Sequence, residues 1–321
     1  MFVILAIQGV LLLLLVCNTP WISLVYCGLF LGSFLLPPFL ERSKTDAAKT
    51  NKPLKTKEIL KKLYPPISND EKVQLVTDRV IGLVLYDPEN TASLANFEIV
   101  KSHSNCVFAR KARIWGSPEW KDILSLEGNI IRMLPQFLKF SLLCPTEKQD
   151  GFLLELPGKP YGTSVQSFGD ALYTVLKILS DFDPAGFHCM DKSYVHRSGW
   201  VFRFNKVTFF ITTFAPFYPE NHARYCFGAE NCYILFQPEL SFAHHDLPSD
   251  TLETNWENPE TVRDRIRVAF KMAGRQYKIP NTLSSPMVLD MIPPVSADEP
   301  VYEWWKPRHS KDMSNGKDTV T

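Results

Sequence analysis

The sequence predicts an α+β fold, in which helices flank a mainly antiparallel sheet and an N-terminal transmembrane anchor precedes the folded body. Three observations lead to this prediction. Residues 2–40 contain no charged side chain. Segments rich in β-branched and aromatic residues, which are typical of strands, are concentrated between positions 200 and 238. Helical patterns lie on both sides of these segments, without the regular alternation of helix and strand that builds a parallel sheet.

The uncharged N-terminal stretch is longer than the roughly 20 apolar residues that cross a bilayer. Asn18, Thr19 and Pro20 interrupt it, so that it forms either one long tilted span or a hairpin of two short helices. A cleaved signal peptide is the alternative, but the stretch lacks a basic n-region and far exceeds a normal apolar core. We therefore predict a transmembrane anchor over residues 1–40.

Residues 41–62 form a basic linker with eight Lys or Arg side chains against three acidic ones. Positive residues beside a span stay on the cytoplasmic side. We therefore expect the folded domain, residues 63–307, to face the cytosol, with the anchor in the endoplasmic reticulum. The polar residues 308–321 are predicted to be a disordered tail.

Charge and cysteine content indicate which partners and which covalent links to expect. Removing the linker from the totals of 35 basic and 34 acidic residues leaves 27 and 31, so the remaining chain is mildly acidic. This balance argues against nucleic acid as a partner. Seven cysteines in a reducing compartment predict no disulfide framework, and Cys106 is expected to be a free thiol.

Two helices are well indicated. In "SFGDALYTVLKILSDFDP", Ser167 and Asp170 have the spacing of a capping box. In "NPETVRDRIRVAFKMAGRQY", Asn258 is a natural N-cap and Pro259 fits the first turn. Residues 119–143 also have a helical pattern, which we expect Pro135 to break.

Three strands are indicated between these helices. "WVFRF" and "VTFFITTF" flank Asn205-Lys206 and predict a hairpin. "CYILFQP", which ends at Pro238, is the third strand. Tyr302, Trp304 and Trp305 near the C-terminus are expected to pin that end of the domain to the core.

Cys106 is the first candidate functional residue. It follows Ser104 and Asn105, which favour a helix start, and "CVFARKARIW" can continue as a helix. A thiol in the first turn, with Arg110 and Arg113 one and two turns on, would have a lowered pKa. The resulting thiolate could attack an electrophile or bind a soft metal, haem iron included. The alternative is a half-buried cysteine that only fills space.

The segment "TFAPFYPENHARY" (213–225) is the second candidate. It follows a strand and brings together Tyr218, His222, Arg224 and Tyr225. Loops at a sheet edge commonly carry function. The alternative is an ordered loop whose aromatic rings pack while His222 and Arg224 face water.

The order of several sequence segments makes the chain resemble the YqcI/YcgG family over roughly residues 63–307. They are "NCVFARKA", "GWVFRFNKVTFFITTFAPFYPENHARY", "CYILFQPELSF", "IRVAFKMAGRQY" and "VYEWWKP". Phe217 stands where the family often has a second cysteine, which removes an alternative ligand. Val107, Phe108 and Ala109 replace the usual Pro-Phe-Gly type of sequence.

The resemblance implies a haem-dependent N-oxygenase. Family members with assigned chemistry hydroxylate an amine or guanidine nitrogen of amino-acid-derived substrates. By this resemblance Cys106 is the iron ligand, and His222 and Arg224 are the catalytic polar residues. Arg110 and Arg113 would bind the propionates of haem b, with Tyr218 and Tyr225 beside the cofactor.

The predicted reaction uses dioxygen and a small polar nitrogen-containing substrate, and the anchor would place the domain beside a membrane-bound reductase. Two alternatives stay open. One is a covalent catalyst that uses Cys106 and His222. The other is a membrane-tethered binding protein of the same fold without catalysis.

Overall fold

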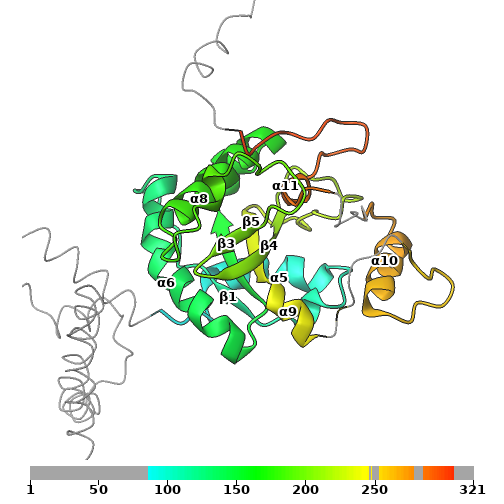
Figure 1. Cartoon of the computed structure of the whole chain (residues 1–321). Coiled ribbons are helices and arrows are strands. Elements are labelled where there is room, and N and C mark those ends of the chain that lie inside the picture. Colours follow the sequence, from blue (N-terminus) through cyan, green and yellow to red (C-terminus); the bar gives the residue numbers. More distant parts are fainter. Residues whose placement is uncertain (1–85, 246, 248–252, 278–284, 307–321) are drawn as a thin grey trace, which may run out of the picture. The chain divides into compact units, whose positions relative to one another are not determined.

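The computed structural model describes residues 86–245, 247, 253–277 and 285–306, which belong to the unit Leu75–Thr321 (Figure 1). The predicted anchor (1–40), linker (41–62) and tail (308–321) lie outside the described residues. Within the described part, no helix combines the length and the apolar character that a bilayer span requires.

The centre of the domain is a five-stranded sheet in the order β1-β2-β5-β4-β3. Its strands are β1 (Ile114–Gly116), β2 (Gly151–Leu156), β3 (Phe202–Phe204), β4 (Val207–Phe214) and β5 (Cys232–Pro238). β1 and β2 pair in parallel, whereas the other three pairings are antiparallel. The α+β class is therefore confirmed, with a sheet that is mixed.

The predicted hairpin is present as β3 and β4. Its two turn residues, Asn205 and Lys206, have φ values of 48° and 67°. Positive φ at both turn positions matches the right-handed twist of the paired strands. The Asn205 amide also donates to Asp183 Oδ1 at 2.7 Å, which ties the turn to the loop after the helix α8 (Val165–Asp181).

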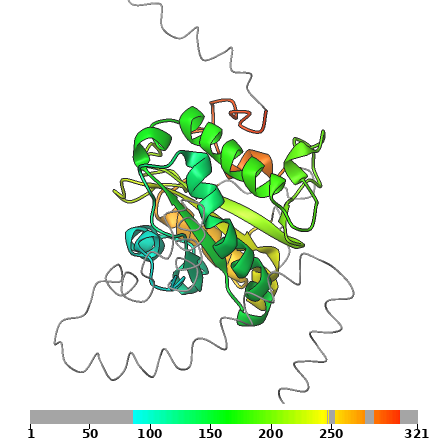
Figure 2. The ribbon, with the colours of Figure 1, turned by 90° about the vertical axis from the view of Figure 1, so that its left-hand side faces the viewer.

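Helices lie on both faces of the sheet (Figure 2). The longer ones are α5 (Ala92–His103), α6 (Leu126–Glu147), α8 (Val165–Asp181) and α10 (Val262–Met272). The shorter ones are η2 (Ala109–Lys111), α7 (Gly158–Tyr161), η3 (Cys189–Asp191), α9 (Glu239–His244) and α11 (Val288–Met291).

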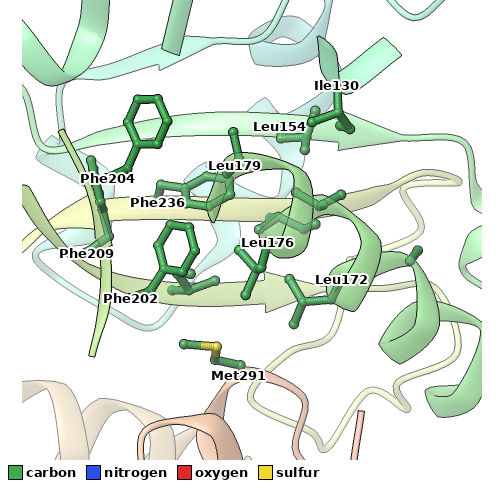
Figure 3. Packing of buried hydrophobic residues seen from close by; sticks show 14 of the residues in the cluster. Ile130, Leu154, Leu172, Leu176, Leu179, Phe202, Phe204, Phe209, Phe236 and Met291 are labelled. Atoms are coloured by element: carbon green, nitrogen blue, oxygen red, sulfur yellow. The ribbon is translucent and has the colours of Figure 1, made fainter. Parts of the chain in front are cut away.

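Strand alternation explains the two-sided core. In β2, Phe152 and Leu154 point into the larger cluster with α6 and α8, whereas Leu153 points into a second cluster with α5. β5 repeats this pattern, because successive side chains of a strand point to opposite faces. Figure 3 shows the larger cluster, in which Leu172, Leu176 and Leu179 of α8 face Phe202, Phe209 and Phe236 of the sheet.

The starts of two predicted helices differ from the expectation. α8 is capped by Ser164, and Ser167 is its partner in the capping box. Asp170, the predicted partner of Ser167, instead accepts from the Tyr302 hydroxyl at 2.6 Å. α10 is capped by Thr261 with Asp264 as its partner, three residues after the predicted cap. In both cases a hydroxyl and a side chain three residues on satisfy each other's backbone amides, which fixes the first turn.

The prediction that Pro135 breaks the third helix is wrong. α6 runs without interruption from Leu126 to Glu147, with Pro135 inside it. An internal proline costs a helix roughly 3 kcal/mol. Burial of Ile130, Met133, Phe137 and Phe140 on one face of α6 offsets that cost.

The C-terminal tryptophans close the larger cluster as predicted. Trp304 is 1% exposed and its indole N–H donates to the Val288 carbonyl at 2.9 Å. Trp305 is buried beside it. All the cysteines that the structure describes are free thiols, which agrees with the absence of a disulfide framework in this part of the chain.

Candidate functional site

Cys106 lies in the turn between α5 and η2. α5 ends at His103, and the Cys106 amide donates to the Ser104 hydroxyl at 3.1 Å. A hydroxyl that bonds the backbone two residues on favours a turn over a helix. The predicted helix starting at Cys106 is therefore wrong, because only the single turn η2 follows and residues 114–116 join the sheet as β1.

The surroundings of the Cys106 sulfur have opposing effects on its acidity. Burial has the largest effect and raises the pKa of the thiol. The backbone amides of Ala109 and Phe108 bond to the sulfur, and the guanidinium groups of Arg110 and Arg224 attract its negative charge, so that all four lower the pKa. Because burial outweighs them, the expected low pKa is wrong for the protein alone.

Cys106 is half-buried against a small apolar cluster. The cluster is built on Phe108 with Ile266 and Phe270 of α10, and Ala223 also packs against it. The thiol therefore lies between the turn after α5, the loop after β4 and the inner face of α10.

His222 is a buried side chain with an exposed fraction of 7%. Its ring stacks on Tyr218 at a centroid distance of 4.2 Å. Nδ1 accepts from the Arg224 amide at 3.1 Å, and the ring also donates to the Pro294 carbonyl. Burial, followed by the charge of Arg224, lowers the pKa of His222 to about 4, so the ring is neutral and both nitrogens are used.

Arg224 connects the loop after β4 to Cys106. Its Nη2 donates to the Asp290 carbonyl at 3.2 Å, and its guanidinium lies 6.0 Å from the centre of the Phe214 ring. Cys106, Tyr218, Tyr277 and Asp290 are the groups whose charges act on it. Among the residues predicted from the sequence, the fold thus brings Cys106, Arg110, Tyr218, His222 and Arg224 into one region.

The other two predicted residues have different surroundings. Arg113 donates to the Glu147 carbonyl at 2.6 Å and forms an ion pair with Glu89 at 3.6 Å, at the surface beside the end of α6. Tyr225 is half-buried and lies 5.1 Å from Phe227, centre to centre.

Arg275 is a further site residue that the sequence did not reveal. Its Nη1 donates to Asn105 Oδ1 at 2.5 Å and its Nε donates to the Glu220 carbonyl at 3.2 Å. The guanidinium also lies 4.3 Å from the centre of the Phe227 ring. Arg275 therefore fastens the segment after α10 to the turn that carries Cys106. The only sequence signal is its place after Gly274, where a helix end is expected.

Asp150 is a second residue that sequence reasoning missed. It is 3% exposed, and its Oδ1 accepts from Ser241 at 2.9 Å and pairs with His245 Nε2 at 2.7 Å. Its Oδ2 accepts from the Arg113 amide at 2.8 Å. This carboxylate ties α9 to the start of the sheet.

Two cavities border this region. Phe108, Asp150, Phe97 and Phe214 help to line a cavity of about 30 Å³, which has room for a few water molecules. An open groove of about 260 Å³ lies beside the C-terminal end of α10. Cys106 lines neither of them.

A group of metal-type ligands occurs elsewhere. In the part of the chain that the structure describes, the ligand atoms of Asp181, His188 and Asp191 lie within 4.8 Å of one another. All three are exposed, and the Lys177 ammonium already pairs with both carboxylates.

Comparison with known proteins places this region within a family. The sequence model of the YqcI/YcgG family matches residues 97–273, more than half of the 321-residue chain. The chain belongs to the YqcI/YcgG family. The match runs from α5 through all five strands to the end of α10, and it includes every site residue predicted from the sequence. Neither the curated proteins nor the solved structures include a match to this YqcI/YcgG chain.

Proposed function

We propose that this YqcI/YcgG protein is a haem-dependent monooxygenase that hydroxylates an amine or guanidine nitrogen of a small amino-acid-derived substrate, with Cys106 as the sulfur ligand of iron. The observation that supports it best is the arrangement around the Cys106 sulfur. Two backbone amides bond to this sulfur, and the guanidinium groups of Arg110 and Arg224 act on it. Such donors stabilise an anionic sulfur.

The raised pKa of Cys106 favours a metal ligand over a free nucleophile. A buried thiol without a metal stays protonated at neutral pH. Cys106 would hold a metal cation as a thiolate, because metal binding favours loss of the thiol proton. The chain supplies the remaining stabilisation through Ala109, Phe108 and the two arginines.

When bound, sulfur-ligated haem supplies the activation of dioxygen, and the protein supplies position and a water-poor site. Arg224, which is held by the Asp290 carbonyl, would face a propionate or a substrate carboxylate. Neutral His222 cannot act as a free base, since both of its nitrogens are bonded, and its role would be to position Arg224 through the Arg224 amide.

The donor chemistry fits haem, whereas the space beside Cys106 requires a movement. Phe108, Ile266 and Phe270 pack around the half-buried thiol, and neither bordering cavity includes it. Haem binding at Cys106 would therefore require Ile266 and Phe270 to separate from the thiol.

This same packing favours one of the alternatives, a binding protein of the same fold without catalysis. The covalent catalyst is less well supported, because Cys106 has a raised pKa and both ring nitrogens of His222 are already hydrogen-bonded.

We also propose that residues 1–40 anchor the chain in the endoplasmic reticulum, with the domain facing the cytosol. A membrane-bound reductase is the expected electron donor, and failure of such a reductase to reduce the haem of the full chain would contradict that pairing.

The test is an absorption spectrum of the full chain after reconstitution with haem b, recorded reduced and under carbon monoxide. Wild type is expected to show the red-shifted band that sulfur ligation gives. Cys106→Ala should lose this band, and Lys111→Met, a neighbouring exposed change, should keep it. Wild type that binds no haem would overturn the proposal in favour of the binding protein. An unchanged band in Cys106→Ala would place the ligand at another residue.

A further inference from the structure

The groove at the C-terminal end of α10 is formed where the chain turns back after the helix. α10 ends at Met272, and Gly274 has a φ of +69°, a left-handed conformation that glycine adopts without strain. The Gly274 and Arg275 amides donate to the Lys271 and Phe270 carbonyls at 3.0 Å each. The next amide, of Gln276, donates to the Asn221 carbonyl at 2.8 Å and fixes the returning chain to the loop after β4.

The lining of this groove is strongly basic. It contains Arg267, Lys271 and Arg275 and no acidic residue. Arg275 donates to neutral oxygens, the Asn105 side chain and the Glu220 carbonyl. Asp264, the capping carboxylate of α10, acts on Arg267. Arg267 is 2% exposed and donates to the Glu253 carbonyl and the Thr254 hydroxyl, so Lys271 and Arg275 supply the positive charge that can attract an anion.

Two aromatic rings complete the groove. Trp256 is 44% exposed, and the Lys271 ammonium lies 4.5 Å from the centre of its ring. Tyr277 is 38% exposed and packs its ring on Phe270 at 4.6 Å. Exposed rings beside cations offer a stacking surface next to an anion site.

The size of the groove restricts the ligand. A volume of about 260 Å³ lies just below the roughly 300–1,000 Å³ of most small-molecule pockets. The groove is open to solvent, so part of a ligand can extend beyond it. A small molecule with one planar ring and a phosphate group suits these dimensions and this lining.

We propose that the groove between Trp256, Lys271 and Tyr277 binds a nucleoside phosphate, with the phosphates at Lys271 and Arg275 and the base against the exposed ring of Trp256. This site does not depend on iron at Cys106. It lies close to Cys106 in the fold, because Arg275 bonds to Asn105.

The experiment is calorimetric titration of the full chain with adenosine diphosphate, and with adenosine and pyrophosphate as its two halves. The diphosphate should bind at least about tenfold more tightly than either half, since it gains both the charge-assisted contact and the stacked ring. Lys271→Met should weaken binding of the diphosphate and pyrophosphate about tenfold. Trp256→Leu should weaken binding of the diphosphate and leave pyrophosphate binding unchanged.

Two controls make the result specific. Arg265→Gln removes a cation of the same helix that does not line the groove, and it should leave binding unchanged. Cys106→Ala should also leave it unchanged, which separates this site from the proposed iron ligand. The proposal is overturned if the diphosphate does not bind, if Lys271→Met has no effect, or if polyglutamate binds as tightly, which would show a charged surface without a nucleotide site.

Discussion

Acidification is predicted to destabilise this protein through His222. The side chain is 7% exposed and neutral, with its pKa lowered to about 4 by burial and by Arg224. In the unfolded chain the same ring titrates near its ordinary pKa of 6.5. Between these two values the unfolded state binds a proton that the folded state does not, so stability falls as the pH falls from about 6.5 to about 4.

The size of the effect follows from these two pKa values. One pKa unit corresponds to about 1.4 kcal/mol. Between about pH 7.5 and about pH 5, His222 should therefore remove about 2 kcal/mol from the free energy of unfolding. In a domain of this size, that change lowers the melting temperature by about 4–8 °C. The physical cause is that protonation would break the bond from the Arg224 amide to Nδ1 and place a second cation beside the Arg224 guanidinium.

The assay is urea unfolding across this pH range, for wild type and for His222→Gln, which keeps a donor and an acceptor but does not titrate. The variant is expected to be less stable at neutral pH and to lose about 2 kcal/mol less on acidification. If both proteins lose the same stability between about pH 7.5 and about pH 5, His222 is not the neutral, bonded ring described above.

The remaining predictions concern the core and the thiol. Phe137→Ala should lower the free energy of unfolding by about 3–5 kcal/mol, because Phe137 is fully buried among five aromatic rings. Thermal melting measures this loss. Phe182→Ala is the control, because the Phe182 side chain is 55% exposed. Arg110→Met should raise the pKa of Cys106 further and slow its alkylation by iodoacetamide, followed by mass spectrometry of the peptide that contains it, whereas the exposed Lys111→Met should not.

Each of these two predictions has a clear contrary result. Equal losses of stability in the two phenylalanine variants would mean that the ring cluster of α6 and the sheet is not the main core. Equal alkylation rates in wild type and Arg110→Met would mean that the Arg110 guanidinium does not act on the Cys106 sulfur.

Much of the fold could be predicted from the sequence, because the determining interactions are local. The hairpin could be predicted because two segments rich in β-branched and aromatic residues flank Asn205-Lys206, and these two residues adopt the positive φ of a two-residue turn. The nearly continuous apolar run in 232–238 reflects burial on both faces of one strand. The late tryptophans were predicted correctly to be buried, since two large rings near a chain end rarely stay in water.

The predictions that were wrong concern residues whose structure depends on non-local packing. Pro135 lies inside α6 because burial of one helix face outweighs a missing backbone bond. Residues 114–116 become β1 because they pair in parallel with residues 151–153, a partner that no local pattern reveals. Arg113 had helical spacing from Cys106, but the absence of a helix directs it towards Glu147.

The sequence by itself determined the α+β class, the family, the hairpin and the residues to consider, Cys106 and the loop of His222 and Arg224. Only the tertiary structure decided the pKa shifts, and so the protonation, of those residues. Burial raises the pKa of Cys106 and lowers that of His222, and Arg224 acts on both. Exposure and the distance between charges depend on all the elements that pack together, so no spacing along the chain reveals them.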